Sequence, residues 1–122
     1  MVEGALFEFC RGDTYTRDFS ISGWSHSIDK VFFTVKENVN NKRFCLQKTL
    51  DNGITLVDET EDGERTYNLA ICCTDTEKLK TDIDYTFDIE IHSLVGEETI
   101  KQTIVTGIMR LKASSTKACN EC

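Results

Sequence analysis

The sequence predicts an all-β domain of about eight short strands, because apolar residues recur at every second position in runs separated by polar turns. The clearest run is 85–92, in which Tyr85, Phe87, Ile89 and Ile91 alternate with polar residues. Side chains on a strand point alternately to opposite faces, so this pattern buries one face of a sheet and leaves the other in water. Turn signals recur throughout, and no long amphipathic helix is present. These observations favour a two-layer antiparallel sandwich of 7–8 strands with one short helical turn.

The expected strands follow one another between polar connections. Asp51-Asn52-Gly53 is a strong turn, because Asn-Gly readily takes the positive φ angles of a tight hairpin. The segment 58–64 is acidic, contains a glycine and is expected to be an exposed turn. The strands are expected at 6–10, 14–22, 28–36, 43–49, 54–58, 66–72, 85–92 and 99–111. The side chains expected in the core include Val31, Phe33, Val35, Phe44, Leu46, Tyr67, Leu69 and Ile71.

Two places depart from simple alternation. Residues 74–83 interrupt the strands, and Thr74 or Asp75 can cap a single helical turn there, since a side-chain oxygen satisfies free backbone N–H groups. In the last strand the apolar phase shifts after Gly107, to Met109 and Leu111. We therefore expect a β-bulge at Gly107.

The sequence from Leu79 to Tyr85 sharpens the predicted architecture. A short helical turn followed by a tyrosine at the start of a strand is typical of the tyrosine corner of immunoglobulin-like sandwiches. There the tyrosine hydroxyl bonds to upstream backbone and holds the connection between the sheets, so Tyr85 is the expected structural corner. Phe87 and Phe19 stand where a cross-sheet disulfide would be, and aromatic packing is expected in its place. The prediction is an immunoglobulin-like β-sandwich rather than a barrel.

Length and charge limit the classes of function. The chain has 122 residues, enough for one domain, which we place at 1–112 with a flexible polar tail at 113–122. Its net charge of −7 argues against nucleic acid as a partner and against contact with an anionic membrane. No apolar stretch is long enough to span a membrane, and the first five residues lack the pattern of a secretory signal, so we expect synthesis in the cytosol.

The six cysteines are therefore interpreted as those of a reducing compartment. Those at 10, 45, 72 and 73 lie in or beside strands and are expected to act as small apolar side chains. Cys119 and Cys122 have the spacing of a metal or redox pair, but a structural zinc site needs four ligands. A tail without function, a local disulfide and half of an intersubunit metal site all stay open for this pair. We assign no metal ligand and no cofactor.

Two aromatic residues are candidate interface residues. Phe32 is expected on the outer face of its strand, where a phenylalanine is more typical of a contact surface than of open water. Trp24 lies in the loop 22–27 and either stacks on a ligand such as a sugar ring or closes the end of the core.

Other patterns have a structural explanation as well. Arg11-Gly12-Asp13 spells an integrin-binding tripeptide but also a turn before a strand. The carboxylates between Asp75 and Asp84 could gather near a calcium ion, yet they lack the spacing of an EF-hand loop. His26 and His92 have no hydrolase motif around them, and the chain carries no phosphate-binding loop. We expect no enzyme activity and assign no catalytic residue.

Several segments resemble one family of phage proteins. The segments that carry the resemblance are Gly12–Phe19, Ile28–Lys36, Leu46–Leu50, Asp84–Ile91 and Thr103–Gly107. Together they are similar to the N-terminal domain family of phage baseplate upper proteins, an immunoglobulin-like module of tail structures in phages and prophages of Gram-positive bacteria. The resemblance covers the chain to about Leu111.

The resemblance implies a non-enzymatic virion structural or assembly protein. Its partners would be other phage structural proteins or further copies of itself, in the bacterial host cytoplasm during assembly and then in the virion. With one expected domain, the chain would depart from baseplate upper proteins, which have long helical and receptor-binding-protein-holding parts, so a head or tail decoration protein or a small tail component is expected to fit as well. The alternative function is a carbohydrate-binding β-sandwich module, suggested by Trp24, Tyr15 and the acidic loops.

Overall fold

The computed structural model describes residues 2–38 and 40–113, and within them the chain is almost entirely β-structure. The strands run close to the predicted ranges, and a single 3-10 turn, η1, lies at Cys73–Asp75. The strands are β1 (Val2–Cys10), β2 (Tyr15–Ile21), β3 (Lys30–Lys36), β4 (Leu46–Leu50), β5 (Gly53–Glu59), β6 (Arg65–Ile71), β7 (Asp84–Val95) and β8 (Glu98–Lys112).

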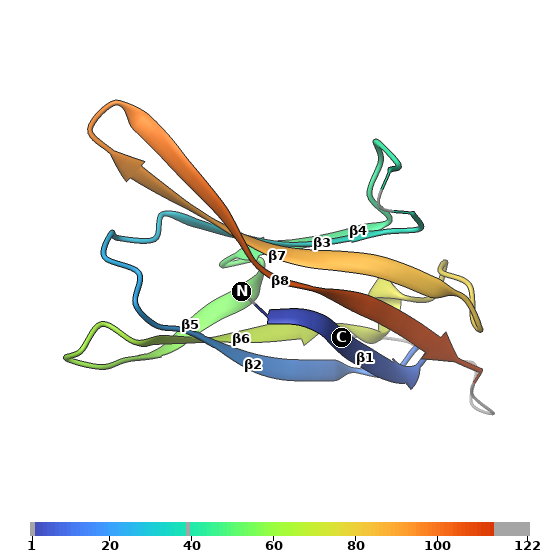
Figure 1. Ribbon diagram of the computed structural model, residues 1–122. Coiled ribbons are helices and arrows are strands. Elements are labelled where there is room, and N and C mark those ends of the chain that lie inside the picture. Colours follow the sequence, from blue (N-terminus) through green and yellow to red (C-terminus); the bar gives the residue numbers. More distant parts are fainter. Residues whose placement is uncertain (1, 39, 114–122) are drawn as a thin grey trace.

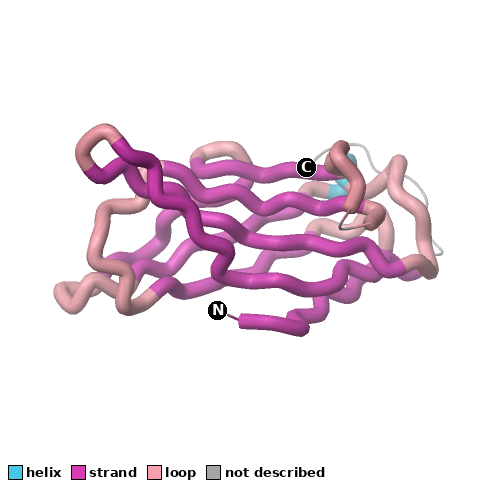
Figure 2. The backbone as a smooth tube through the Cα atoms, turned by 45° about the horizontal axis from the view of Figure 1, so that its top comes forward, coloured by secondary structure: helices cyan, strands magenta, loops and turns pink. Residues whose placement is uncertain are grey.

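All eight strands belong to one mixed sheet, which is nearly closed into a barrel (Figure 1). The order of neighbours is β1-β8-β7-β3-β4-β5-β6-β2. Seen from a second direction, the strands form one curved wall, and the connecting loops gather at its two ends (Figure 2). The prediction of an immunoglobulin-like, two-sheet sandwich is therefore wrong.

Two parallel pairings keep the sheet continuous and explain this error. β1 runs parallel to β8, and β4 runs parallel to β5 through the short register Thr49 to Gly53 and Leu50 to Ile54. The segment 51–53 is a turn as expected, with Asp51 at φ 67° and Gly53 at φ 100°. It does not form a hairpin but carries the chain sideways into the next strand position. Alternation alone does not distinguish this step from a hairpin.

The barrel is closed by side chains where its two edge strands meet. β1 and β2 lie at opposite ends of the strand order, so no backbone ladder joins them. Instead the ring of Tyr15 stacks on Phe9 with centroids 4.3 Å apart and contacts Phe7 at 5.5 Å. The guanidinium of Arg17 lies 5.2 Å from the centre of the Phe7 ring. This seam thus depends on aromatic and cation–π contacts rather than on backbone hydrogen bonds.

The core fills the interior of the barrel with inward side chains from all eight strands. Most of the expected core is confirmed, but Phe44 is exposed because β4 begins only at Leu46. The predicted pairing of Phe87 with Phe19 is also wrong. Phe87 packs on Phe7, with ring centres 4.4 Å apart, whereas Phe19 stacks on Tyr67 of the adjacent strand. The fully buried large side chains are Phe33, Ile54, Leu69, Ile71, Ile89, Ile91, Met109 and Leu111.

The irregularity in β8 lies at Ile104 and not at Gly107. Ile89 pairs with Val105 and Glu90 with Thr103, so Ile104 is the extra residue. Gly107 has a different role, because a Cβ atom there would lie 2.2 Å from the carbonyl oxygen of Ala5. The glycine is therefore required for the close approach of β1 to β8.

Tyr85 is buried at the start of β7, and its hydroxyl accepts a hydrogen bond of 2.8 Å from the backbone N–H of Lys80. The contact ties the segment after η1 to the barrel. The same local arrangement that suggested an immunoglobulin-like sandwich is thus compatible with a different topology.

The cysteines divide into two groups. Cys10 and Cys45 are free thiols, whereas Cys73, which the sequence suggested to be a thiol, is disulfide-bonded. The expectations for Cys119, Cys122 and most of the polar tail lie outside the described residues. Within 2–38 and 40–113, no helix has the length and apolar character needed to cross a bilayer.

Candidate binding site at the open side of the barrel

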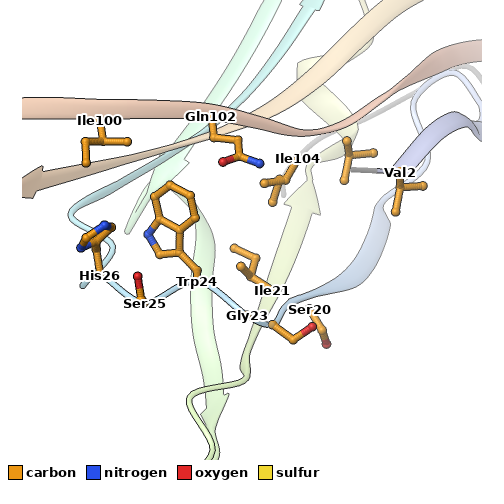
Figure 3. A pocket seen from close by; sticks show the side chains of 12 residues that line it. Val2, Ser20, Ile21, Gly23, Trp24, Ser25, His26, Ile100, Gln102 and Ile104 are labelled. Carbon is orange, nitrogen blue, oxygen red and sulfur yellow. The ribbon is translucent and has the colours of Figure 1, made fainter.

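A pocket of about 650 Å³ opens between the first half of β8 and the loop that joins β2 to β3 (Figure 3). Its apolar walls come from three distant parts of the chain: the start of β1, the end of β2 and the first half of β8. Polar groups are contributed by the loop 22–26 and by β8. The residues lining it include Val2, Ile21, Trp24, His26, Ile100, Gln102 and Ile104.

Trp24 reaches from the loop towards β8 and is held at its polar end. Its Nε1 donates a hydrogen bond of 2.8 Å to the hydroxyl of Ser93, which is completely buried in β7. The ring packs against the core, and His26 meets it edge to face at 5.7 Å. Trp24 therefore closes part of the barrel interior and at the same time forms one wall of the pocket. The structural interpretation, in which Trp24 closes the end of the core, is confirmed, whereas stacking on a ligand stays a prediction.

The pocket lies beside a length of β8 that has no neighbour on one side. β1 pairs with β8 only from Val2 opposite Val105 to Cys10 opposite Lys112. The first half of β8, Glu98–Ile104, therefore pairs with β7 alone among the described strands. At the level of β1, the space between β8 and β2 holds one strand, whereas at the level of the pocket it holds no strand from residues 2–38 or 40–113.

Backbone geometry shows which groups this free edge presents. The carbonyl oxygen of His92 accepts a hydrogen bond of 2.9 Å from Asp29 on the β3 side, so even-numbered residues of this part of β7 face β3. The odd-numbered residues then face β8, where they pair with Ile100 and Gln102. The backbone N–H and C=O groups of successive residues in a strand point to opposite sides. Those of Ile100 and Gln102 point towards β7, so those of Thr99, Lys101 and Thr103 point to the free edge.

Phe32 lies elsewhere, on the outer face of β3. It is half-buried, and its ring contacts that of His92 with centroids 4.8 Å apart. The same outer face carries Glu90, whose Oε1 lies 2.5 Å from Nε2 of His92, and Asp88. Burial raises the pKa of the Asp88 carboxyl, and the neighbouring Glu90 adds to this effect. The structure does not bring Phe32 and Trp24 together into one surface, since one faces outwards and the other lines the interior.

The remaining candidates from the sequence have structural contacts. Asp75 Oδ2 accepts a hydrogen bond from the backbone N–H of Cys72 and pairs with Lys48 at 2.7 Å, so its carboxylate has a structural role. Gly12 donates its N–H to the hydroxyl of the fully buried Thr76, which fixes the turn 11–13 against the loop after η1. Among the described residues, no group of three or more His, Cys, Asp or Glu side chains has the geometry to hold a metal ion.

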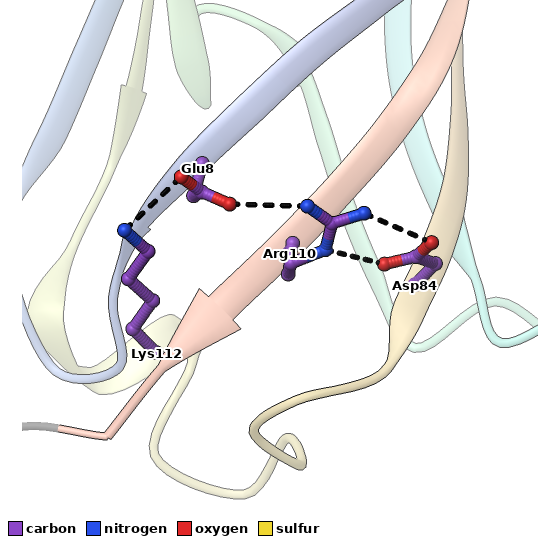
Figure 4. A network of polar contacts seen from close by, with 4 residues as sticks. All are labelled: Glu8, Asp84, Arg110 and Lys112. Carbon is purple, nitrogen blue, oxygen red and sulfur yellow. Dashed lines mark hydrogen bonds and ion pairs between the residues drawn. The ribbon is translucent and has the colours of Figure 1, made fainter.

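A chain of ion pairs crosses three strands at the other end of the barrel (Figure 4). Arg110 on β8 binds Asp84 on β7 with two hydrogen bonds, of 2.6 and 3.1 Å, and lies 3.2 Å from Glu8 on β1. Lys112 contacts the other oxygen of Glu8 at 3.1 Å. Hydrogen bonds from Lys112 and Arg110 lower the pKa of Glu8, and the hydrogen bonds from Arg110 lower the pKa of Asp84. Both carboxylates raise the pKa of Arg110 in return.

Replacing Arg110 by glutamine is expected to raise the pKa values of both Glu8 and Asp84 towards those of free side chains. Because their pKa values are lower in the folded state than in the unfolded state, the pairs stabilise the fold above the ordinary carboxyl pKa. This contribution disappears as the pH falls through the lowered values. NMR titration of the side-chain carboxyl carbons measures each pKa directly.

Lys112→Gln is the matched control for this titration. It is expected to raise the pKa of Glu8 and to leave that of Asp84 unchanged, because Lys112 contacts Glu8 alone in this network. Identical carboxyl pKa values in the native chain and in Arg110→Gln would contradict the arrangement of this network.

Sequence analysis identified Trp24 but missed the free edge beside it. The edge is created by the parallel pairing of β1 with β8, and a parallel pairing leaves no local mark on the sequence.

Comparisons with known proteins identified no relative of this chain. No protein-family model matches the chain, and no curated protein matches it.

Proposed function

We propose that this protein is a non-enzymatic structural or assembly protein of a phage or prophage, which acts by binding neighbouring virion proteins. The observation that carries the proposal is the open side of the barrel, where the free edge Glu98–Ile104 lies over an apolar pocket. Exposed strand edges pair with other chains through main-chain hydrogen bonds, and proteins that do not use such edges commonly cover them.

The phage assignment is supported by the resemblance to baseplate upper proteins. Four of the five segments that carry it, 28–36, 46–50, 84–91 and 103–107, fall on β3, β4, β7 and β8, which are neighbours in the sheet. The fifth segment, 12–19, falls on β2 at the other end of the strand order. The proposal concerns the role in assembly and not the immunoglobulin-like fold of that family, which this chain does not have.

Exposed apolar side chains on the outside of the barrel support association with proteins. Leu6 and Ile108 stand opposite each other on β1 and β8, with 48% and 37% of their surfaces exposed. Both are on the outer face, where a large aliphatic pair contributes little to the core and is suited to contact with a partner. The acidic chain, at −7, favours partners with basic surfaces.

The carbohydrate-binding alternative receives less support from the geometry. A sugar-binding tryptophan presents an open ring face to the ligand. Here the indole N–H is used by Ser93, and the ring is packed against the core. We therefore place protein association ahead of glycan binding for the same pocket.

The proposal is tested by mixing the purified 122-residue chain, at micromolar concentration, with purified head and tail proteins of a phage that infects Gram-positive bacteria. Sedimentation velocity is expected to show a complex with at least one of them, and chemical cross-links are expected to fall near β8. A chain that remains monomeric and unbound with every head and tail protein would overturn the proposed function. So would specific glycan binding that disappears in Trp24→Ala.

A further inference from the structure

The open side of the barrel is a vacant strand position in line with β1. β1 occupies the space between β8 and β2 as far as Val2, and Val2 itself lines the pocket. Beyond it, seven residues of β8, Glu98–Ile104, continue at the same edge without a strand beside them among the described residues. Seven residues of strand span about 23 Å, at about 3.3 Å per residue.

We propose that this position accepts an extended segment of a neighbouring protein, with apolar side chains at alternate positions, as a ninth strand beside β8. The proposal rests on the proposed function and names the form of the partner that the site takes. A strand is the occupant that fits both the free edge of β8 and the apolar pocket beside it. Its backbone pairs with the N–H and C=O groups of Thr99, Lys101 and Thr103, and its inward side chains fill the pocket.

The floor of the pocket determines the pattern of the segment. Ile21, Ile100 and Ile104 provide apolar contact from two strands, and the Trp24 ring closes the end. Gln102 adds an amide to this lining, and the inward side chains of the segment are expected to be apolar. Outward positions of the added strand lie beside the outward side chains of β8, including Lys101, and face solvent.

A different protein fits this position better than a second copy of the chain. Each copy carries a net charge of −7, and two copies pairing through this edge would bring like charges together. A segment that carries basic residues is attracted by the net negative charge of the chain. Dimerisation through the same edge is therefore an outcome that contradicts the proposal.

The probe is a synthetic eight-residue peptide, Lys-Thr-Val-Thr-Ile-Thr-Val-Lys, with both ends blocked, added to the 122-residue chain. Amide hydrogen exchange measured by NMR is expected to slow on the order of tenfold or more at Thr99, Lys101 and Thr103. The amides of Ile100 and Gln102, which already bond to β7, are expected to change little. A control peptide with proline in place of the central isoleucine and its following threonine lacks two donors and is expected to give no protection.

Two variants of the chain separate strand addition from other kinds of binding. Ile100→Thr removes apolar surface from the floor, and we expect it to weaken peptide binding on the order of tenfold. Val57→Thr removes apolar surface from an exposed side chain of β5 that does not line the pocket, and binding is expected to stay within about threefold. Circular dichroism checks that both variants keep the fold.

Several results would overturn the proposal. One is peptide binding that quenches Trp24 fluorescence without protecting the three edge amides, because the pocket would then accept a side chain or ligand and not a strand. Another is concentration-dependent dimerisation that protects the same amides in the absence of peptide. The absence of any protection up to millimolar peptide would overturn this inference alone, because the proposed function would still stand on complexes with virion proteins.

Discussion

Replacing Phe87 by alanine is expected to lower the free energy of unfolding by about 4 kcal/mol, the largest effect of any single side-chain truncation that we predict. Phe87 is 4% exposed and lies at the centre of the aromatic cluster inside the barrel. Its ring centre is 4.4 Å from that of Phe7 and 5.4 Å from that of Phe33, so it joins β1 to β3 through the interior. Truncation leaves a cavity bounded by these rings, which the rigid strands cannot close.

Urea unfolding followed by far-ultraviolet circular dichroism measures this effect as a shift in midpoint at an unchanged slope. Phe32→Ala is the matched control, because it removes the same side chain from the outer face of the neighbouring strand. Phe32 is half-buried and contacts His92 on one side only, so its loss is expected to cost about 1 kcal/mol. Equal effects of the two substitutions would contradict the assignment of the inner and outer faces.

Local features of this fold are those that the sequence alone predicts well. All eight strands were expected within a few residues, and the alternation correctly placed Val31, Phe33 and Val35 inside. These assignments depend on the two-residue period of a strand, which each segment carries in its own composition. Phe44 is the exception, because the alternation continues beyond the point at which the strand begins.

The topology depends on information that no single segment carries. The two parallel pairings, β1 with β8 and β4 with β5, decide between a barrel and a sandwich. The first joins residues about a hundred positions apart, and the second is a short sideways step at a turn that also suits a hairpin. The tyrosine corner also carries no information about the topology, because its hydrogen bond from Lys80 to Tyr85 joins residues only five positions apart.

The candidate site follows from that topology and was only partly predictable. Trp24 could be singled out because a lone tryptophan in a polar loop is unusual. The free edge of β8 could not be identified from the sequence, because it exists only where β1 does not extend along the first half of β8. Lys101 and Thr103 have no unusual sequence context, and their importance comes entirely from the direction of their backbone groups.

Replacing Gly107 by alanine is expected to destabilise the fold by about 3 kcal/mol, although a single methyl group is added. The new Cβ would lie 2.2 Å from the carbonyl oxygen of Ala5 and 2.8 Å from two ring carbons of Phe87. The ring could shift, but the carbonyl belongs to the backbone of β1, so relief requires β1 to move away from β8. The same movement would open the aromatic seam between β1 and β2, where Phe7 and Tyr15 meet.

The position of the damage distinguishes this explanation from general overpacking. In Gly107→Ala, amide exchange is expected to accelerate first along β1, while the amides shared by β5 and β6 keep their native rates in mild denaturant. Thr99→Ala, an exposed substitution on the same strand, is expected to change stability by less than about 0.5 kcal/mol. A Gly107→Ala variant as stable as the native chain would show that β1 does not approach β8 so closely. The strand position in line with β1 would then lose its structural basis.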